Sequence, residues 1–245
     1  MARVHDAWLD GKDNFEADRE LAGRMCAIDP ELPRRAQQGR EFVTAVVARA
    51  ARAGICQFLD LGCGMPARPS VAEAARDVNP AARVAYVDND PVVASHRRAL
   101  SAGGPGLAAV RADLADPAAV LGTEDVRKVI DLAEPVCVLL GSVLHFFQTG
   151  DACKIVAGYA ERVAPGSWIA VSVVHYADTD LLAKLTAVYS PAQFFNHGAA
   201  GIASWMAGLD LLPPGITEAR RWLAGITSAG PGQPAWMLAA AAVAR

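Results

Sequence analysis

The chain has 245 residues, of which 53% are hydrophobic, so it is long enough to bury a sizeable core as one domain. Lys and Arg number 23 and Asp and Glu number 26, which gives a formal net charge of −3 with no block of like charge. This balance excludes a basic surface of the kind that binds nucleic acid, the N-terminal residues lack the apolar core of a signal peptide, and no apolar run approaches the length of a membrane span. We therefore expect one cytoplasmic domain over residues 1–245, with residues 1–53 as an N-terminal cap.

The first half of the chain alternates helical and strand patterns. Apolar spacing predicts a helix over about 35–52 and another near 70–78, and apolar runs predict strands at 55–61, 83–87 and 107–111. Asp90-Pro91 and Asp116-Pro117 each predict a helix start, because an N-cap carboxylate is followed by a first-turn proline.

The second half begins with a continuous apolar run at 135–140, which is typical of a central strand covered on both faces. Further patterns predict a helix at 151–163, a strand at 167–173, helices at 181–188 and from Ser190-Pro191, and short strands at 211–212 and 236–240. We expect the last strand to pair antiparallel beside the neighbour of the strand at 167–173. The alternation predicts an α/β fold, with a doubly wound, mostly parallel, seven-stranded sheet and an N-terminal helical cap.

An acidic residue closes the apolar run of each of three of these strands, namely Asp60, Asp88 and Asp113. The ligand crevice of an open parallel sheet lies beyond the carboxyl ends of its strands, so the three carboxylates would face one bound molecule. A carboxylate accepts hydrogen bonds from an amine, a ribose diol or an adenine amino group, and it repels a pyrophosphate. The pattern favours S-adenosylmethionine over a nucleotide polyphosphate.

The loop Gly62-Cys63-Gly64-Met65-Pro66-Ala67 matches the dinucleotide pattern G-x-G-x-x-G/A, which alone is a weak signal. Pro66 offers no amide donor to a pyrophosphate, and Asp113 has no duty in dinucleotide binding, so a nicotinamide cofactor is disfavoured. The alternative interpretation is that the glycines only make a strand-to-helix turn and that the aspartates are solvated.

Each acidic residue has one predicted role at this site. Asp60 would hold the amino-acid end of the cofactor, Asp88 both ribose hydroxyls, and Asp113 the adenine amino group. The other predicted cofactor residues are the loop glycines and residues near the strand ends: Gly62, Gly64, Asn89, Leu114 and Ser142. The cysteines lack the spacing of a metal knuckle, so we expect reduced thiols and no metal site.

Four segments carry a resemblance to a known family: Asp10-Gly11-Lys12-Asp13-Asn14-Phe15, residues 57–62, residues 86–93 and Val143-Leu144-His145-Phe146. Over nearly its whole length the chain resembles an actinobacterial family of S-adenosylmethionine-dependent methyltransferase-like proteins. The resemblance implies a class I methyltransferase fold with the cofactor site described above. It also implies that Lys12, Asn14 and Phe15 bind the cofactor as a cap over its methionine end. From the residues alone, that segment would be an exposed turn.

The chain departs from the family's pattern where the methyl acceptor is expected. Cys63 stands where the family has Thr, and Arg68-Pro69-Ser70-Val71 stands where it has an Asn/His pair. A usual Ser-His pair is replaced by Ser172-Val173, with His175 two residues further on.

Two histidines are candidate catalytic residues: His145 after the fourth strand and His175 after the fifth. His145 could instead cap a helix or fill a gap. We expect methyl transfer from S-adenosylmethionine to a small molecule in specialised metabolism, with no nucleic-acid or membrane partner and with a homo-oligomer left open. Two alternatives stay open: a cyclase or isomerase that retains the cofactor, and a non-catalytic cofactor-binding module.

Overall fold

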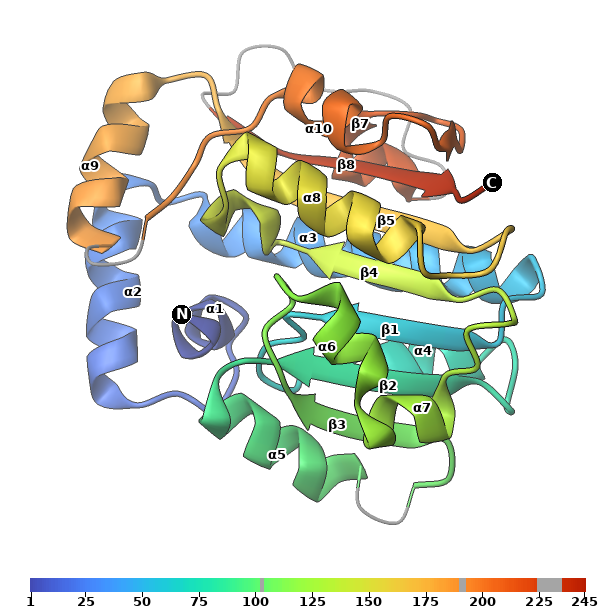
Figure 1. The fold of residues 1–245 in the computed structure, drawn as a ribbon. Coiled ribbons are helices and arrows are strands. Elements are labelled where there is room, and N and C mark those ends of the chain that lie inside the picture. The colour runs from blue at the N-terminus through green and yellow to red at the C-terminus, as the bar shows by residue number, and fades with distance from the viewer. Residues whose placement is uncertain (102–103, 190–192, 224–234) are drawn as a thin grey trace.

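The computed structural model describes residues 1–101, 104–189, 193–223 and 235–245. Within these ranges one sheet is flanked by helices on both faces (Figure 1). The strands of the sheet are β1 (Gln57–Leu61), β2 (Arg83–Asp88), β3 (Leu107–Arg111), β4 (Cys137–Gly141), β5 (Trp168–Tyr176), β6 (Asp210–Leu211), β7 (Thr217–Glu218) and β8 (Ala235–Val243).

The described helices run from one end of the chain to the other. They are α1 (Ala2–Trp8), α2 (Glu16–Ile28), α3 (Leu32–Arg52), α4 (Val71–Arg76), α5 (Pro91–Ser101), α6 (Pro117–Gly122), α7 (Glu124–Val129), α8 (Thr149–Ala160), α9 (Thr179–Tyr189) and α10 (Ala199–Trp205), with single 3₁₀ turns η1 (Leu144–Phe146) and η2 (Ala219–Trp222). Among the described residues, no helix is both long enough and apolar enough to cross a bilayer.

The strand order is β3-β2-β1-β4-β5-β8-β6, with the short strand β7 also paired to β8. Strands β1 to β5 are parallel, and β8 runs antiparallel to β5. The prediction of a doubly wound, mostly parallel sheet is therefore confirmed. The order reverses between β1 and β4, and a ligand crevice is expected beyond the carboxyl ends of strands at such a switch point.

The position predicted for the last strand was wrong by one place. β8 pairs directly with β5, from Trp168↔Val243 to Tyr176↔Ala235, rather than with a neighbour of β5. This long antiparallel pairing also explains why β5 continues three residues past the expected end at residue 173. The helix expected to start at Ser190-Pro191 lies outside the described residues.

The sheet separates two apolar layers. Strand side chains alternate between the faces, so Cys137 and Leu139 of β4 pack with α3, whereas Val138 and Leu140 pack with α8. The central strands are buried on both faces, as their continuous apolar runs predicted.

Both predicted aspartate caps are present. Asp90 Oδ1 accepts a hydrogen bond from the Val92 N–H at 2.8 Å, and Asp116 Oδ1 accepts one from the Ala119 N–H at 2.9 Å. A capping box that was not predicted, between Ser70 and Glu73, starts α4. These caps fix where the helices leave the carboxyl edge of the sheet.

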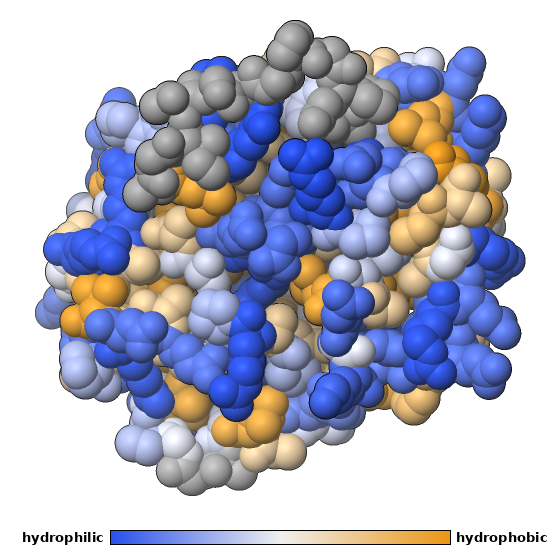
Figure 2. All heavy atoms as spheres, turned by 180° about the vertical axis from the view of Figure 1, so that it is seen from behind, coloured by the Kyte–Doolittle hydropathy of each residue, from blue (hydrophilic) through white to orange (hydrophobic). Residues whose placement is uncertain are grey.

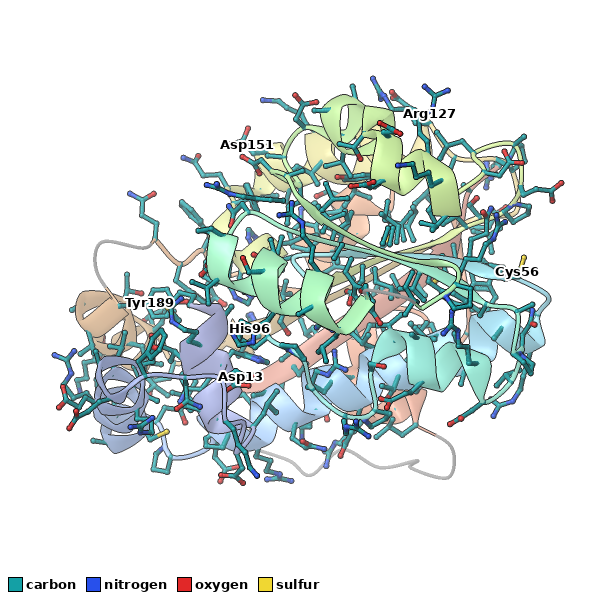
Figure 3. The ribbon with its side chains drawn as sticks, turned by 90° about the horizontal axis from the view of Figure 1, so that it is seen from below. Asp13, Cys56, His96, Arg127, Asp151 and Tyr189 are labelled. Atoms are coloured by element: carbon teal, nitrogen blue, oxygen red, sulfur yellow. The ribbon has the colours of Figure 1, made fainter. Side chains whose placement is uncertain are left out.

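The polar N-terminal stretch forms α1 and α2, which lie at the carboxyl ends of the parallel strands, whereas α3 lies along the sheet (Figure 1). Arg3 ties these helices to the sheet, because its guanidinium donates to Asp18 at 2.9 Å and to Asp90 at 3.3 Å. Asp13 Oδ1 lies 3.7 Å from Nδ1 of His96 in α5, and Figure 3 shows the two side chains close together. Of the residues 1–53 expected to form a cap, we keep the name N-terminal cap for residues 1–28, because α3 lies along the sheet.

The surface in Figure 2 is mainly hydrophilic, and its hydrophobic residues form small separate patches. Across the described residues, the large hydrophobic side chains that are exposed are Phe15, Leu100 and Leu211. Single exposed side chains of this kind are ordinary in soluble proteins.

Candidate functional site

The described residues define a cavity of about 380 Å³ at the carboxyl ends of β1, β2 and β4. Its walls also include residues of α1, α3 and α9. The structure brings together most of the predicted site residues as lining of this cavity: Asp60, Gly62, Gly64, Asp88, Asn89, Asp113, Leu114, Ser142 and His145. The remaining predicted residues, Lys12, Asn14, Phe15 and His175, are not among those that line it.

The glycine loop after β1 is folded back onto the end of β2. The N–H groups of Gly62 and Cys63 donate to the Val87 carbonyl at 2.8 and 3.1 Å. Gly62 has a φ of +64°, and a Cβ there would lie 2.4 Å from Val143 Cγ1. Only glycine fits this close approach of the loop to the end of β4.

Arg97 of α5 fixes the carbonyl groups of the same loop. It donates to the oxygens of Cys63, Gly64 and Met65 at 2.8, 3.0 and 3.2 Å, and it is only 4% exposed. Its guanidinium carbon also lies 4.6 Å from the centroid of the Tyr86 ring. An arginine within an amphipathic helix gives no sequence signal for this role, so sequence reasoning missed Arg97.

Asp88 is 9% exposed, and each of its carboxylate oxygens accepts one backbone hydrogen bond. Oδ2 accepts from the Gly64 N–H at 2.9 Å and Oδ1 from the Asp90 N–H at 3.0 Å. Burial raises the pKa of Asp88, and these two hydrogen bonds oppose the shift. A carboxylate oxygen accepts more than one hydrogen bond, so both oxygens remain suited to a pair of hydroxyl donors.

Asp60 is 5% exposed, and its Oδ2 is buried without a hydrogen-bond partner in the described parts of the chain. Burial raises the pKa of Asp60, whereas the nearby Arg97 and Arg40 guanidinium groups lower it. Arg40 of α3 also lines the cavity and was not predicted. A buried carboxylate with an unpaired oxygen suits an ammonium donor.

The residues predicted to surround an adenine lie at the more open side of the cavity. Asn89 and Asp113 are exposed, and Leu114 is half-buried. Asp113 Oδ1 accepts from the Ala115 N–H at 2.9 Å, which shapes the turn after β3. Tyr159 of α8 donates to the Leu114 carbonyl at 3.1 Å and so holds this turn against the sheet.

Ser142 follows β4 in a left-handed conformation, with a φ of +57°. Its N–H donates to Ser172 of β5, at 2.9 Å to the carbonyl oxygen and 3.2 Å to the hydroxyl oxygen. A Cβ on Gly39 of α3 would lie 2.9 Å from Ser142 Oγ. The serine is therefore held between β5 and a close approach of α3.

His145 lies in η1, directly beyond β4, and is 8% exposed. Its ring stacks on Phe194 at 4.6 Å between centroids and meets the edge of Phe146 at 4.4 Å. Burial, with smaller effects of His5 and His197, lowers the pKa of His145 to about 3. Its Nδ1 is buried and has no partner among the described residues. His145 is thus a neutral imidazole in the wall of the cavity.

His175 lies on the other face of the sheet. Its neighbours in β5, Val174 and Tyr176, line the cavity, and side chains alternate along a strand. The His175 ring packs edge-on against Trp236 of β8 at 5.1 Å. The structure therefore does not bring His175 and His145 together.

Lys12 and Phe15 are exposed, and Phe15 is 62% exposed. Asn14 donates to Asp6 Oδ2 at 2.8 Å, and the Asp13 N–H donates to the same oxygen at 3.0 Å. Asp6 itself lines the cavity. The segment therefore wraps around a cavity residue of α1, a contact that sequence spacing did not reveal.

The far end of the cavity is mainly apolar, and we call it the apolar end. It is lined by Met25, Leu32, Val174, Leu182, Leu185, Tyr189, Phe194 and Met237, together with Arg35 and Tyr176. Figure 3 shows Tyr189 on the same side of the molecule as the N-terminal cap and Cys56 at the distant end of the sheet.

Across the described ranges, no group of three or more His, Cys, Asp or Glu side chains is arranged to hold a metal ion.

Comparison with known proteins places the chain in a family. The sequence model of a family described as S-adenosyl methyltransferase matches residues 1–245. A proposed methyltransferase from Thermobifida fusca YX is 34% identical, with a TM-score of 0.92, over 100% of this chain and 94% of that one. A DUF574 family protein from Streptomyces avermitilis MA-4680 is 32% identical, with a TM-score of 0.92, over 100% of this chain and 97% of that one.

A more distant likeness concerns the fold alone. Magnesium protoporphyrin IX methyltransferase from Synechocystis PCC 6803, with bound SAH, is 16% identical, with a TM-score of 0.56, over 99% of this chain and 93% of that one. Comparison with curated proteins finds no match. The acidic residues and glycine loop fit an adenosyl cofactor, since Asp60 has an unpaired buried oxygen and Asp88 two oxygens suited to hydroxyl donors. The chain belongs to the S-adenosyl methyltransferase family, with the class I methyltransferase fold and S-adenosylmethionine as its cofactor.

Proposed function

We propose that this protein methylates a small-molecule acceptor, in specialised metabolism. The observation that carries the proposal is that the acidic residues and the apolar end belong to one cavity. S-adenosylmethionine, when bound, supplies a methyl group on a sulfonium. The chain's own contribution is to position the acceptor, which accounts for much of the acceleration in such displacements. Residues of helices line the apolar end. Separately, the net charge of −3 disfavours a nucleic-acid acceptor.

The test is formation of S-adenosylhomocysteine from S-adenosylmethionine in the presence of a panel of small aromatic and aliphatic compounds, with peptides and RNA as comparison acceptors. We expect turnover with members of the small-molecule panel only. Turnover on peptide or RNA would contradict the proposal. Cofactor binding without turnover on any acceptor would favour a non-methylating enzyme or a binding module. The same assay separates the two candidate catalytic histidines. Loss of turnover in His145→Gln alone supports His145, and loss in His175→Gln alone supports His175.

The cofactor roles proposed for individual residues follow from their surroundings. We assign Asp60 to the amino group of the cofactor and Asp88 to the ribose hydroxyls. Asn89, Asp113 and Leu114 are assigned to the adenine. Gly62, Gly64 and Ser142 would shape the space for the methionine part.

Replacing Asp88 by Ala should weaken S-adenosylmethionine binding by about 1.5–3 kcal/mol, which is roughly ten- to 150-fold, because hydrogen bonds to a charged group are lost. Asp60→Ala should weaken it at least as much. Isothermal titration calorimetry measures both. Asp116→Ala is the matched control, since it removes an aspartate N-cap outside the cavity lining. Unchanged affinity in folded Asp60 and Asp88 variants would refute these roles.

We propose that His145 contacts the acceptor and accepts a hydrogen bond from it, which orients the reacting group toward the cofactor. A neutral imidazole has one nitrogen that accepts a hydrogen bond, and the low pKa of His145 keeps it neutral. His5 of α1 lines the same cavity, and burial lowers its pKa to about 4. Both imidazoles are therefore unprotonated at pH 7.

The neutral state of His145 predicts how stability depends on pH. Its pKa is about 3 in the folded protein and about 6.5 when unfolded, so the unfolded chain binds more protons between these values. The free energy of unfolding should fall as the pH is lowered from about 6.5 toward 3, and this contribution should be constant above about 6.5. Urea unfolding at several pH values measures the slope. His145→Gln should flatten it, whereas His96→Gln, on the surface, should not. Equal slopes in all three proteins would contradict the assignment.

We also propose that the N-terminal cap closes over the bound cofactor. Residues of α1 line the cavity, and Arg3 and Asp6 tie α1 to its surroundings through the contacts described above. Lys12, Asn14 and Phe15 would then act by supporting α1, with Asn14 holding Asp6.

Limited trypsin digestion tests the cap. Cleavage after the exposed Lys12 should slow at least about tenfold when S-adenosylmethionine is added, because closing segments become ordered on binding. Arg3→Ala should speed this cleavage in the free protein. Arg127, exposed on α7 away from the cap (Figure 3), is the internal control site. Equal cleavage after Lys12 with and without cofactor would remove the cap from the site.

A further inference from the structure

A buried ionic cluster lies at the apolar end of the cavity. Arg35 of α3 is 5% exposed, and Asp29, at the end of α2, is 3% exposed. Arg35 Nη2 forms an ion pair with Asp29 Oδ2, and the Tyr176 hydroxyl donates to the same oxygen at 3.2 Å. Arg35 and Tyr176 line the cavity, whereas Asp29 does not. A molecule at this end therefore meets the guanidinium and not the carboxylate.

Arg35 has hydrogen-bond donors that the described residues do not use. A guanidinium carries several N–H donors in a planar fork. Within the described ranges its hydrogen-bond acceptor is Asp29, which Nη2 contacts, and neither Nη1 nor the enclosed Nε has a partner. A buried donor is stabilised when it gains an acceptor. The ligand group that fits this position is an oxygen that accepts a hydrogen bond.

The apolar end offers a ligand little net charge. Asp29 balances Arg35, and burial raises the pKa of Tyr176, which keeps its hydroxyl protonated. His5 and His145 are neutral at pH 7, since burial lowers their pKa values to about 4 and about 3. A carboxylate or an ammonium group placed here would lose its hydration without gaining an unpaired counter-charge, which is unfavourable.

We propose that the methyl acceptor is an uncharged, largely apolar ring compound with a hydrogen-bond-accepting oxygen, and that Arg35 selects it by donating to that oxygen. The walls that would hold the ring are Leu32, Val174, Leu185, Tyr189 and Phe194. This inference rests on the proposed function, because it names the class of acceptor for the same cavity.

The protein without substitutions, which we call the parent, is first saturated with S-adenosylhomocysteine. Calorimetry then measures its affinity for naphthalene derivatives that differ in one substituent. The probes carry an acetyl group, an isopropyl group of similar shape, a carboxylate or an aminomethyl group. The acetyl compound should bind at least about tenfold more tightly than each of the others, as expected for a hydrogen bond to a charged donor.

Variants then assign the preference to Arg35. Removing Arg35 alone would leave a buried, uncompensated carboxylate, which is strongly destabilising, so Asp29→Asn is combined with Arg35→Gln. The double variant should lose the preference for acetyl over isopropyl and keep its affinity for S-adenosylhomocysteine. Arg34→Gln is the matched control, because the Arg34 side chain is 53% exposed and pairs with Glu31 on the surface.

The outcomes separate this inference from the proposed function. Tighter binding of a charged probe, equal binding of the acetyl and isopropyl compounds, or binding of no probe while S-adenosylhomocysteine binds would overturn the inference alone. Failure of the parent to bind S-adenosylhomocysteine would instead contradict the cofactor site. If the double variant does not fold, the ranking of the probes on the parent decides.

Discussion

The hydrogen bonds from Arg97 to the loop after β1 hold in place the end of the cavity that contains Asp60 and Asp88, where we propose that the cofactor binds; we call it the proposed cofactor end. One side chain of α5 binds the carbonyl groups of Cys63, Gly64 and Met65, and its charge lies near Asp60 and Asp88. The loop can thus turn its Gly64 N–H to Asp88. Without this cation, two buried carboxylates would lose a compensating charge, which is costly in a protein interior.

The two ends of the cavity differ electrostatically. The proposed cofactor end combines the buried carboxylates of Asp60 and Asp88 with Arg40, which suits a ligand that carries charged groups of both signs. At the apolar end, the Arg35 charge is balanced by Asp29, and the neighbouring imidazoles are neutral. Such a division would allow one cavity to hold a charged cofactor beside an uncharged acceptor.

Local signals predicted much of the framework. The apolar runs of β1, β2 and β4 and the capping aspartates Asp90 and Asp116 act over a few residues, so their positions could be read from the sequence. The place of β8 could not, because its direct pairing with β5 joins segments distant in sequence. The face of the sheet on which His175 lies depends in the same way on the register in which β5 and β8 pair.

The sequence by itself determined the alternation of strands and helices from β1 to β5 and the acidic residue at or near the end of three strands, since both depend on local periodicity and on parallel strands ending at one edge. Tertiary structure alone decided which side chains complete the cavity. Asp6, Arg35 and Arg40 line the cavity and Arg97 binds its glycine loop, and these residues come from three different helices. Helix spacing does not distinguish an arginine that turns inward from one in solvent. Packing of those helices against the sheet sets their direction, and packing depends on contacts between distant parts of the chain.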